Sequence, residues 1–415
     1  MTIIFIFIVF FFLQSNLFCQ DLNYARKTVD TLAAYGMYGR AYVNGGDSIA
    51  AQFIADEFKR NNIQSFGNSY FQNFSLSVNT FPKVVSISSK NKKFITAKDF
   101  YVCSYSNSLT GEKDIFRLKT KAFNNFNKYY KISQIDFSNK IIITDNKFEE
   151  KLYNNPLKAA GILYEYNKLP AWNISEGQYP VEYFAAEVLK KNFKRVKKVS
   201  IVSESVFKTE YTTKNVMAYI PGYLYKDTFV VITAHYDHLG LMGKDVYFPG
   251  ANDNASGVAL MLDLARHFSD NKDSLPYSLV FMAFSGEEVG LLGSFYYVNN
   301  PRFPLNQIKL VLNLDMVGTG SEGITVVNGT KFPYFFNKIY DYNKQYNLVA
   351  SVKARGASAN SDHYPFYEKG VPSLFIYTMG KEHREYHNIE DKPQKLPFTA
   401  YNQLFQLITG FLKIL

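Results

Sequence analysis

The residues of this sequence that could do chemistry are concentrated in six short polar segments after residue 230, each beside an apolar run. The segments share histidines, aspartates and glutamates, and they are residues 234–238, 251–254, 286–288, 313–315, 361–363 and 386–387. Zinc takes histidine nitrogens and carboxylate oxygens as ligands, and two zinc ions close together need a carboxylate that both can share. The sequence therefore predicts a site for two zinc ions per chain.

The elements that must position these segments are predicted from alternating strand-like and helix-like runs after residue 205. The strand-like runs are 228–233, 278–284, 310–314, 324–327 and 373–377. The helix-like runs are 256–268, 291–299, 332–346 and 399–413. Strands rich in Val, Ile and Leu that alternate with helices indicate a parallel sheet covered on both faces. The predicted fold is α/β, with a twisted, mainly parallel sheet sandwiched by helices.

Polar residues follow three of the predicted strands. His235 ends one strand, Glu287 and Glu288 come shortly after a second, and Asp315 follows a third. In open α/β sheets, ligands bind beyond the carboxyl ends of the strands. We therefore expect these side chains to meet at one edge of the sheet.

The charges of such a site balance. Two Zn²⁺ ions carry +4, and two aspartates, one glutamate and a bridging hydroxide carry −4 in total. The metal pair lowers the pKa of the bridging water, and a further carboxylate must take the proton. The Glu287–Glu288 doublet fits this need with one ligand and one base. The site needs only two histidines, and spacing alone does not choose among His363, His383 and His387.

The six segments together resemble the exported di-zinc aminopeptidases of metallopeptidase family 28, clan MH. The matching motifs are Ala-His-Tyr-Asp (234–237), Gly-Ala-Asn-Asp-Asn-Ala-Ser-Gly (250–257), Phe-Ser-Gly-Glu-Glu-Val-Gly-Leu-Leu-Gly-Ser (284–294), Asn-Leu-Asp-Met-Val-Gly (313–318), Ser-Asp-His (361–363) and Tyr-His (386–387). The resemblance runs from residue 205 to the C-terminus, and it is fainter over residues 22–75. Each motif alone is moderately specific, but all of them in this order are highly specific.

The resemblance implies the metal ligands. His235 and Asp315 would bind one zinc ion, Glu288 and His387 would bind the other, and Asp253 would bridge the two. It also implies a cis peptide bond after Asp253.

The resemblance implies three further roles. Glu287 would be the general base, which later passes its proton to the leaving amine. Asp237 would orient the His235 ring. Tyr386 would hydrogen-bond the tetrahedral oxyanion.

The remaining histidines are expected to have other roles. His238 is predicted to line the cleft, and His267 to be structural, near a helix C-terminus where an imidazole suits the helix dipole. His363 is expected to form a hydrogen bond beside the ligands and not to bind metal. His383, on a loop, is expected to be exposed to solvent.

The expected function is hydrolysis of N-terminal residues from peptides by a zinc-dependent exopeptidase. Two alternatives share the fold: a glutaminyl cyclase with a single zinc ion, and a carboxypeptidase or dipeptidase. A third alternative is a receptor-like binding protein without catalytic activity. The complete set of five ligands argues against this last alternative.

The N-terminal part predicts export and a second domain. Residues 1–19 are typical of a secretory signal peptide, which indicates a periplasmic or extracellular protein, with lipid anchoring at Cys19 as the alternative. Residues 20–80 are predicted to form the N-terminal helical part of the catalytic domain. Residues 81–204 are predicted to be a smaller β-rich inserted domain that resembles a protease-associated module, and 205–415 to be the di-zinc catalytic domain.

The composition excludes some classes of partner. The net charge is +10, but the lysines are scattered, and the densest run, residues 190–198, reads as the end of a helix, where cations are favoured. No nucleic-acid motif accompanies them. After the leader, Cys103 is the only cysteine, so no internal disulfide is expected, and no later segment is long and apolar enough to span a membrane.

Overall fold

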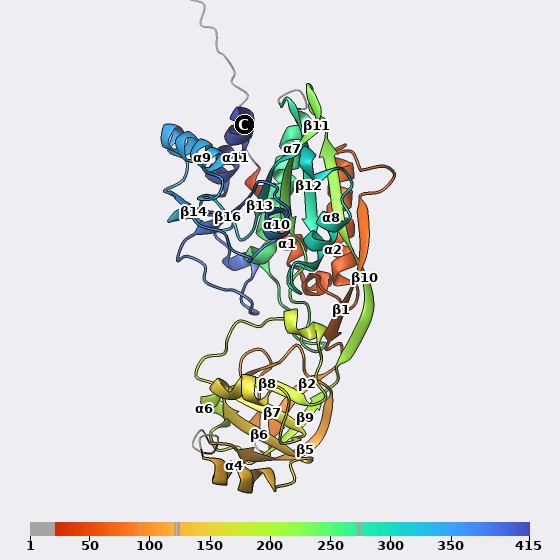
Figure 1. Ribbon diagram of the computed structural model, residues 1–415, viewed down its shortest axis with the longest axis vertical. Coiled ribbons are helices and arrows are strands. Elements are labelled where there is room, and N and C mark those ends of the chain that lie inside the picture. The colour runs from red at the N-terminus through yellow and green to blue at the C-terminus, as the bar shows by residue number, and fades with distance from the viewer. Residues whose placement is uncertain (1–20, 91, 120–121, 123–124, 272–274) are drawn as a thin grey trace, which may run out of the picture.

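The computed structural model describes residues 21–415 except residues 91, 120–121, 123–124 and 272–274. The predicted leader, residues 1–19, lies outside the described residues. Two eight-stranded sheets form two parts of an elongated molecule, with the first sheet above and the second below (Figure 1).

The first sheet has the strand order β1-β10-β12-β11-β13-β16-β14-β15. Its strands are β1 (Phe71–Thr80), β10 (Val206–Ile220), β11 (Tyr225–His235), β12 (Tyr277–Phe284), β13 (Ile308–Leu314), β14 (Gly323–Val327), β15 (Val352–Ala354) and β16 (Ser373–Met379). The four central strands are parallel, while β10 and β14 join them antiparallel on either side. The predicted α/β fold is confirmed, and its parallel strands are the centre of a mixed sheet.

Helices cover both faces of the first sheet (Figure 1). They are α1 (Leu22–Leu32), α2 (Gly46–Arg60), α7 (Gly257–Asp270), α8 (Leu292–Asn299), α9 (Pro333–Tyr346), α10 (His363–Glu368) and α11 (Tyr401–Ile414). Side chains of α1, α2, α7 and α11 share a core with one set of strand residues, and those of α8 and α10 with the other.

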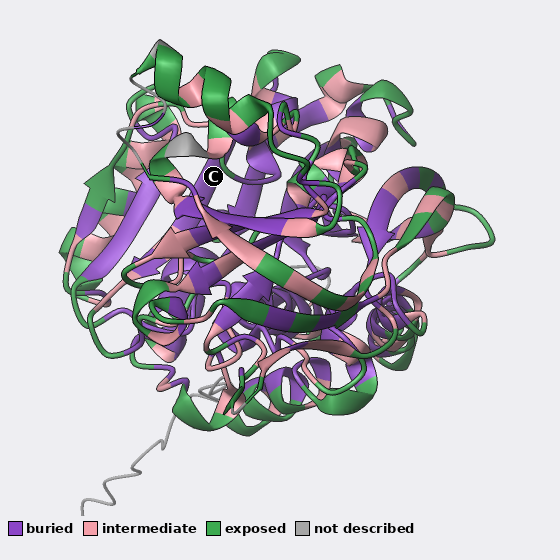
Figure 2. Ribbon diagram, turned by 90° about the horizontal axis from the view of Figure 1, so that it is seen from below, coloured by how far each residue is buried: buried purple, intermediate pink, exposed green. Residues whose placement is uncertain are grey.

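Both faces of the central strands are buried, which explains why their sequences are continuous apolar runs. Along β12, Leu279 and Phe281 pack on the side of α7, whereas Val280 and Met282 pack on the side of α8. Successive strand side chains point to opposite faces, so a strand covered on both sides needs apolar residues at every position. Figure 2 shows these strands buried inside a more exposed shell.

The predicted elements after residue 205 all coincide with observed ones. The largest difference is at the start of β11, which begins at Tyr225 and not at residue 228. The apolar runs located the central strands and the helices α7 and α11 well because these elements are buried along most of their length.

The second sheet is built from the chain between β1 and β10. Its order is β3-β2-β9-β5-β6-β7-β8-β4. Its strands are β2 (Val85–Ser89), β3 (Lys92–Lys93), β4 (Phe100–Val102), β5 (Leu109–Arg117), β6 (Lys140–Asp145), β7 (Gly161–Tyr166), β8 (Phe184–Leu189) and β9 (Lys198–Ser203), with the helices α4 (Phe126–Ser133), α5 (Glu149–Leu152) and α6 (Lys190–Phe193).

The chain leaves the first sheet before this second-sheet part, residues 81–205, and returns to it afterwards at a neighbouring position. Thr80, the last residue of β1, pairs with Val206, the first residue of β10. The chain between them can therefore form its own sheet without changing the register of the first. The assignment of a separate domain here, and its likeness to a protease-associated module, stay predictions.

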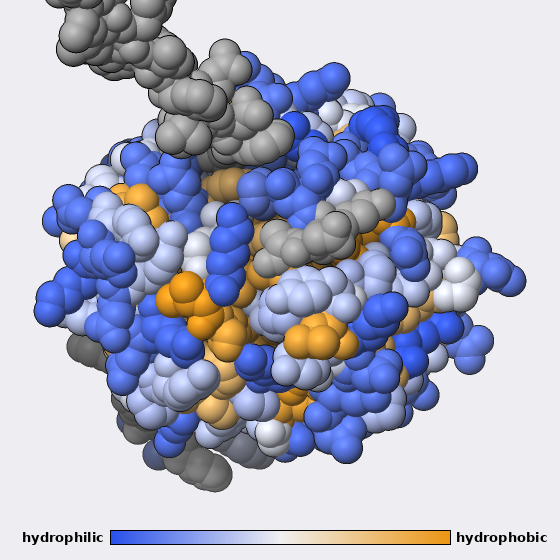
Figure 3. Space-filling view, turned by 90° about the horizontal axis from the view of Figure 1, so that it is seen from above, coloured by the Kyte–Doolittle hydropathy of each residue, from blue (hydrophilic) through white to orange (hydrophobic). Residues whose placement is uncertain are grey.

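The surface at the end of the molecule away from the second sheet is mostly hydrophilic, with apolar side chains in small patches (Figure 3). Among the described residues, no helix combines the length and the apolar character that crossing a bilayer requires. The long apolar runs lie instead in the cores on either side of the first sheet.

Arg40 fastens the N-terminal segment to the loops at the carboxyl edge of the first sheet. It is fully buried, and burial lowers its pKa to about 10, so it stays charged at neutral pH. Its guanidinium donates to the backbone oxygens of Leu32, Tyr236, Pro249, Gly250 and Asp253. One side chain thus satisfies five carbonyls, two of which belong to the predicted metal-binding segment.

We predict that Arg40→Lys lowers the free energy of unfolding by about 2–4 kcal/mol, because an ammonium has three donors and leaves buried carbonyls unpaired. Urea denaturation of the purified protein measures this difference. The control is Arg60→Lys, at a side chain that is 67% exposed, where the change should stay within about 0.5 kcal/mol. Equal stability of the two variants would contradict the role given to Arg40.

Candidate metal centre

The five predicted zinc ligands lie together at the carboxyl edge of the first sheet. His235 ends β11, Asp315 follows β13 directly, and Glu288 follows β12 after a short turn. Asp253 stands before α7, and His387 lies on the loop between β16 and α11. Strand ends and helix starts thus supply four of the five, which gives these ligands rigid support.

Asp253 stands between two groups of ligand atoms. Its Oδ1 lies 3.4 Å from Nε2 of His235, and that nitrogen lies 3.5 Å from Oδ1 of Asp315. Its Oδ2 lies 3.1 Å from Nε2 of His387, and that nitrogen lies 3.1 Å from Oε2 of Glu288. The two oxygens of one carboxylate therefore face different groups, as a carboxylate shared by two cations must.

Two carboxylates of this centre, Asp253 and Glu288, are buried and yet have lowered pKa values. Burial alone would raise their pKa, but the neighbouring histidines outweigh it. Hydrogen bonds with His235 and His387 hold the pKa of Asp253 well below its usual range. The charge of His387 likewise lowers the pKa of Glu288 to about 2. Although burial opposes this, the neighbouring carboxylates in turn raise the pKa of His235 and of His387. The positive charge that keeps Asp253 and Glu288 ionised is thus carried by these rings, and a bound cation would supply it instead.

One buried oxygen supports the fit of a metal ion directly. Within the described residues, Oδ1 of Asp315 has no hydrogen-bond partner. A buried acceptor without a donor is costly, and a cation would satisfy it. Two sets of three donor atoms have Asp253 in common, one with His235 and Asp315 and the other with His238 and Glu288, and the atoms of each set lie within 4.8 Å of one another. Nitrogen and carboxylate donors in such sets fit Zn²⁺.

A chain of polar side chains orients Asp315. Ser361 Oγ donates to Asp315 Oδ2 at 2.8 Å, Asn313 Nδ2 donates to Ser361 Oγ at 2.8 Å, and Thr233 Oγ1 donates to Asn313 Oδ1 at 2.6 Å. This chain leaves Oδ1 of Asp315 to face His235. Sequence reasoning missed it, although Ser361 and Asn313 stand inside the motifs, because nothing local shows that they meet.

Asp391 holds the loop that presents Asp253, and no sequence pattern singled it out. Its carboxylate accepts from the backbone N–H groups of Asn252 and Asp253 at 2.9 and 3.1 Å. Its Oδ1 also lies 2.8 Å from Nε2 of His383, a side chain that is only 2% exposed. The prediction of an exposed His383 is therefore wrong, because the ring is buried in contact with Asp391.

The bond between Asp253 and Asn254 is cis, as the resemblance implies.

The carboxylate of Asp237 lies closer to the Glu287–Glu288 loop than to the ring of His235. It accepts from the backbone N–H groups of Glu287 and Glu288 at 3.2 and 3.3 Å, and from the hydroxyl of Tyr42 at 3.4 Å. Nδ1 of His235 lies 3.2 Å from the backbone oxygen of Asp237 but 3.8 Å from its carboxylate. Asp237 thus reaches His235 through its main chain.

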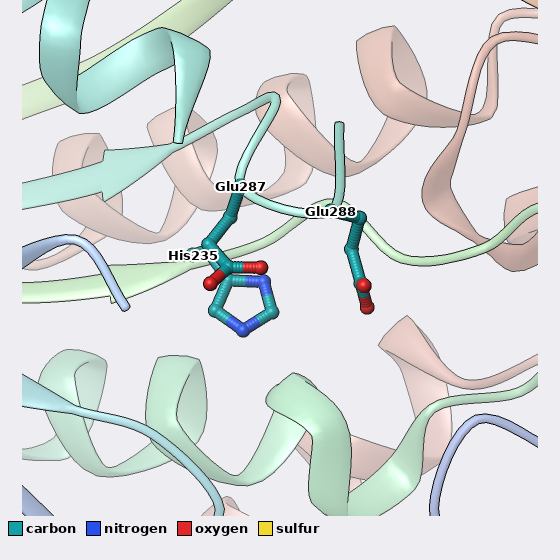
Figure 4. A group of neighbouring side chains, drawn as sticks. All are labelled: His235, Glu287 and Glu288. Atoms are coloured by element: carbon teal, nitrogen blue, oxygen red, sulfur yellow. The ribbon is translucent and has the colours of Figure 1, made fainter. Parts of the chain in front are cut away.

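Glu287 and Tyr386 flank the ligands at a pocket of about 250 Å³. Glu287 lies over the ring of His235, while Glu288 extends beside it (Figure 4). Burial raises the pKa of Glu287 well above its usual range, although His235 opposes this. Tyr386 stacks on the ring of His387, with centroids 3.9 Å apart. The pocket also has Met316, Arg355, Asn360, Phe375 and Tyr377 in its walls.

The other histidines differ in their distance from the centre. Nδ1 of His238 lies 2.7 Å from Oε1 of Glu288, which makes His238 a neighbour of the ligand group as well as a residue of the cleft. His363 is buried against Phe375, outside the sets of donor atoms found among the described residues. His267 lies in the last turn of α7, as expected for a structural residue.

Comparison with known families gives a match over the part of the chain that holds this centre. Residues 215–412 match the family model described as "Peptidase family M28". The chain is 30% identical over 214 residues to Aminopeptidase YwaD of Bacillus subtilis, which covers 49% of this chain and 44% of that protein. It is 30% identical over 205 residues to a probable leucine aminopeptidase of Arthroderma otae, covering 48% and 56%. The chain thus spans about half the length of the curated relatives it matches.

Solved structures resemble the chain over nearly all of its length. The structure of BSAP, a zinc aminopeptidase from Bacillus subtilis, gives a TM-score of 0.72 at 22% identity and covers 94% of both chains. An aminopeptidase from Aneurinibacillus sp. strain AM-1 gives a TM-score of 0.65 at 20% identity, covering 95% of this chain and 93% of that one. At such identity the likeness establishes the fold, and its coverage includes the second-sheet part.

We predict that Ser361→Ala lowers the affinity for zinc at least about tenfold, because supporting hydrogen bonds to a ligand typically contribute that much. Competition with a chromophoric chelator measures the change. Ser133→Ala, on an exposed turn of α4, serves as the control and should bind zinc like the unaltered protein. An unchanged affinity in Ser361→Ala would show that Asp315 does not need this support.

Proposed function

We propose that the protein is a zinc-dependent aminopeptidase with two zinc ions per chain, on the premise that residues 215–412 match the model of peptidase family M28. The observation that carries the proposal is the placement of Asp253, whose two oxygens face His235 with Asp315 and His387 with Glu288. A carboxylate whose two oxygens face different ligand groups can bind two cations at once, whereas a site for one cation does not need this arrangement.

In the proposed reaction, the zinc pair supplies Lewis acidity, which polarises the peptide carbonyl and acidifies a water molecule. The other steps belong to side chains of this chain. Glu287, beside His235 but outside the two ligand groups, takes a proton from the attacking water and returns it to the leaving amine. Tyr386, on the ring of His387, donates a hydrogen bond to the oxygen that becomes negative.

The pocket supports action at a chain end. Its volume of about 250 Å³ suits one side chain and not an extended stretch of peptide. Met316, Phe375 and Tyr377 give it an apolar wall. We therefore propose peptides with an apolar N-terminal residue as substrates.

A cleavage screen tests the activity against its alternatives. Peptides with a free amino terminus should be cleaved, and N-acetylated copies should not, with all activity lost in a zinc chelator. Cleavage of the acetylated peptides from their carboxyl end would identify a carboxypeptidase. Cyclisation of N-terminal glutamine without cleavage would identify a glutaminyl cyclase, and binding without turnover would identify a receptor-like protein.

We also propose that the protein is exported and acts in the periplasm or outside the cell. The support is the apolar leader in residues 1–19 together with a predicted mature chain that has a single cysteine, Cys103, and so depends on packing and metal binding for its stability. Fractionation of cells that carry the full-length protein tests this placement.

We predict that Glu287→Gln retains two zinc ions but loses at least about two orders of magnitude in kcat, because an amide cannot accept the proton. Turnover of an aminoacyl nitroanilide and elemental analysis measure the two properties. The control, Glu112→Gln, alters an exposed acid of the second sheet that pairs with Lys198 and should leave both unchanged. Normal turnover in Glu287→Gln would remove the proposed base.

We predict that His387→Ala reduces the zinc content from two ions to about one per chain, because the Glu288 group loses its nitrogen ligand. His238→Ala is the matched comparison, since His238 also contacts Glu288, and it should retain both ions. Elemental analysis of the dialysed variants decides between the two histidines. The opposite pattern would make His238 the ligand.

A further inference from the structure

A short segment of the second-sheet part reaches the metal centre. It lies between β7 and β8, contains Trp172 to Gln178, and rises toward the first sheet as the yellow-green turn in Figure 1. The carbonyl oxygen of Trp172 lies 2.8 Å from Nδ1 of His387, and the N–H of Trp172 donates to the carbonyl oxygen of His387 at 3.1 Å. The main chain of Trp172 thus binds His387 at both its side chain and its backbone.

The first of these contacts defines which ring nitrogen faces the centre. A carbonyl oxygen can only accept, so Nδ1 of His387 carries a hydrogen and Nε2 is left to bind a cation. Nε2 is the atom that lies 3.1 Å from both Asp253 and Glu288. The second-sheet part therefore sets the tautomer and orientation of this ligand.

The same segment also holds the other ligand of that group. The amide Nε2 of Gln178 donates to the carbonyl oxygen of Val289 at 2.5 Å and to that of Ser175 at 3.2 Å. Val289 directly follows Glu288. Both members of the Glu288–His387 group are thus braced by one piece of chain.

The segment is itself anchored firmly. The indole of Trp172 is buried, its Nε1 donates to the carbonyl oxygen of Val102 in β4 at 2.8 Å, and its ring stacks on Phe248 with centroids 4.6 Å apart. Val102 belongs to the second sheet, whereas Phe248 belongs to the part that carries the metal ligands. Trp172 therefore contacts both parts of the molecule.

Among the described residues, the supports of the other ligand group come from the part built around the first sheet. His235 is held by the backbone of Asp237, and Asp315 by Ser361, both within the part built around the first sheet. We propose that residues 172–178 are a positioning segment for one metal site only, so that the affinity of the Glu288–His387 site depends on the second-sheet part and that of the His235–Asp315 site does not. This inference rests on the proposed two-zinc function.

Trp172 also supplies a built-in probe, because it is the only tryptophan of the chain. Its main chain contacts one of the two ligand groups and not the other. In a titration of metal-free protein with Zn²⁺, its fluorescence should therefore follow the filling of a single site, while calorimetry detects both.

The test compares two variants of the full-length protein in that titration. Gln178→Ala removes the contact with Val289, and Trp172→Phe keeps an aromatic ring on Phe248 but removes the indole donor to Val102. Each should weaken one of the two zinc affinities about tenfold and leave the other unchanged. Gln134→Ala, an exposed glutamine after α4, is the matched control and should change neither.

Two results would overturn the proposal: unchanged zinc affinities in a folded Gln178→Ala variant, or equal weakening of both sites. Trp172→Phe is followed by calorimetry, and if it does not fold, Gln178→Ala alone decides. Failure of the proposed function looks different, because the unaltered protein would then bind fewer than two zinc ions. Two zinc ions in the unaltered protein with unchanged variants would contradict the positioning segment only.

Discussion

The carboxylate of Asp253 has to face two ligand groups at once, and much of the surrounding structure restrains it to do so. Its backbone N–H is held by Asp391, and its backbone carbonyl accepts from the buried guanidinium of Arg40 at 3.1 Å. These contacts fix the backbone from which the carboxylate projects between the two groups. Buried side chains outside the ligand set therefore hold the main chain of the one residue that both groups share.

The burial of these side chains bears on how the site can bind a cation. Asp253 and Glu288 stay ionised inside the protein because histidines stabilise their charge, and Oδ1 of Asp315 has no donor among the described residues. A buried acceptor without a donor is costly, and a cation beside Oδ1 of Asp315 would satisfy it. Because β11 and β13 are adjacent and parallel, they end at the same edge of the sheet, which brings His235 and Asp315 together.

The sequence predicted the strands and helices around the centre because their signal is local: apolar runs of the right length end at polar residues. It could not predict supports that join distant parts of the chain. Arg40 meets Asp253 across 213 positions, and Trp172 meets His387 across 215. His383 was misjudged for a related reason, since its burial depends on Asp391. Nor could spacing choose His387, which only the family resemblance singled out.

The two ligand groups then differ in what holds them. The group of His235 depends on the register of parallel strands, which the second-sheet part does not alter, because that part begins and ends at the paired residues Thr80 and Val206. The group of His387 depends on the packing of Trp172 between two parts of the molecule. A displacement of one part against the other would therefore move one proposed metal site while leaving the other in place. The second-sheet part thus bears on the chemistry through the two hydrogen bonds between Trp172 and His387 and the contact of Gln178 with Val289.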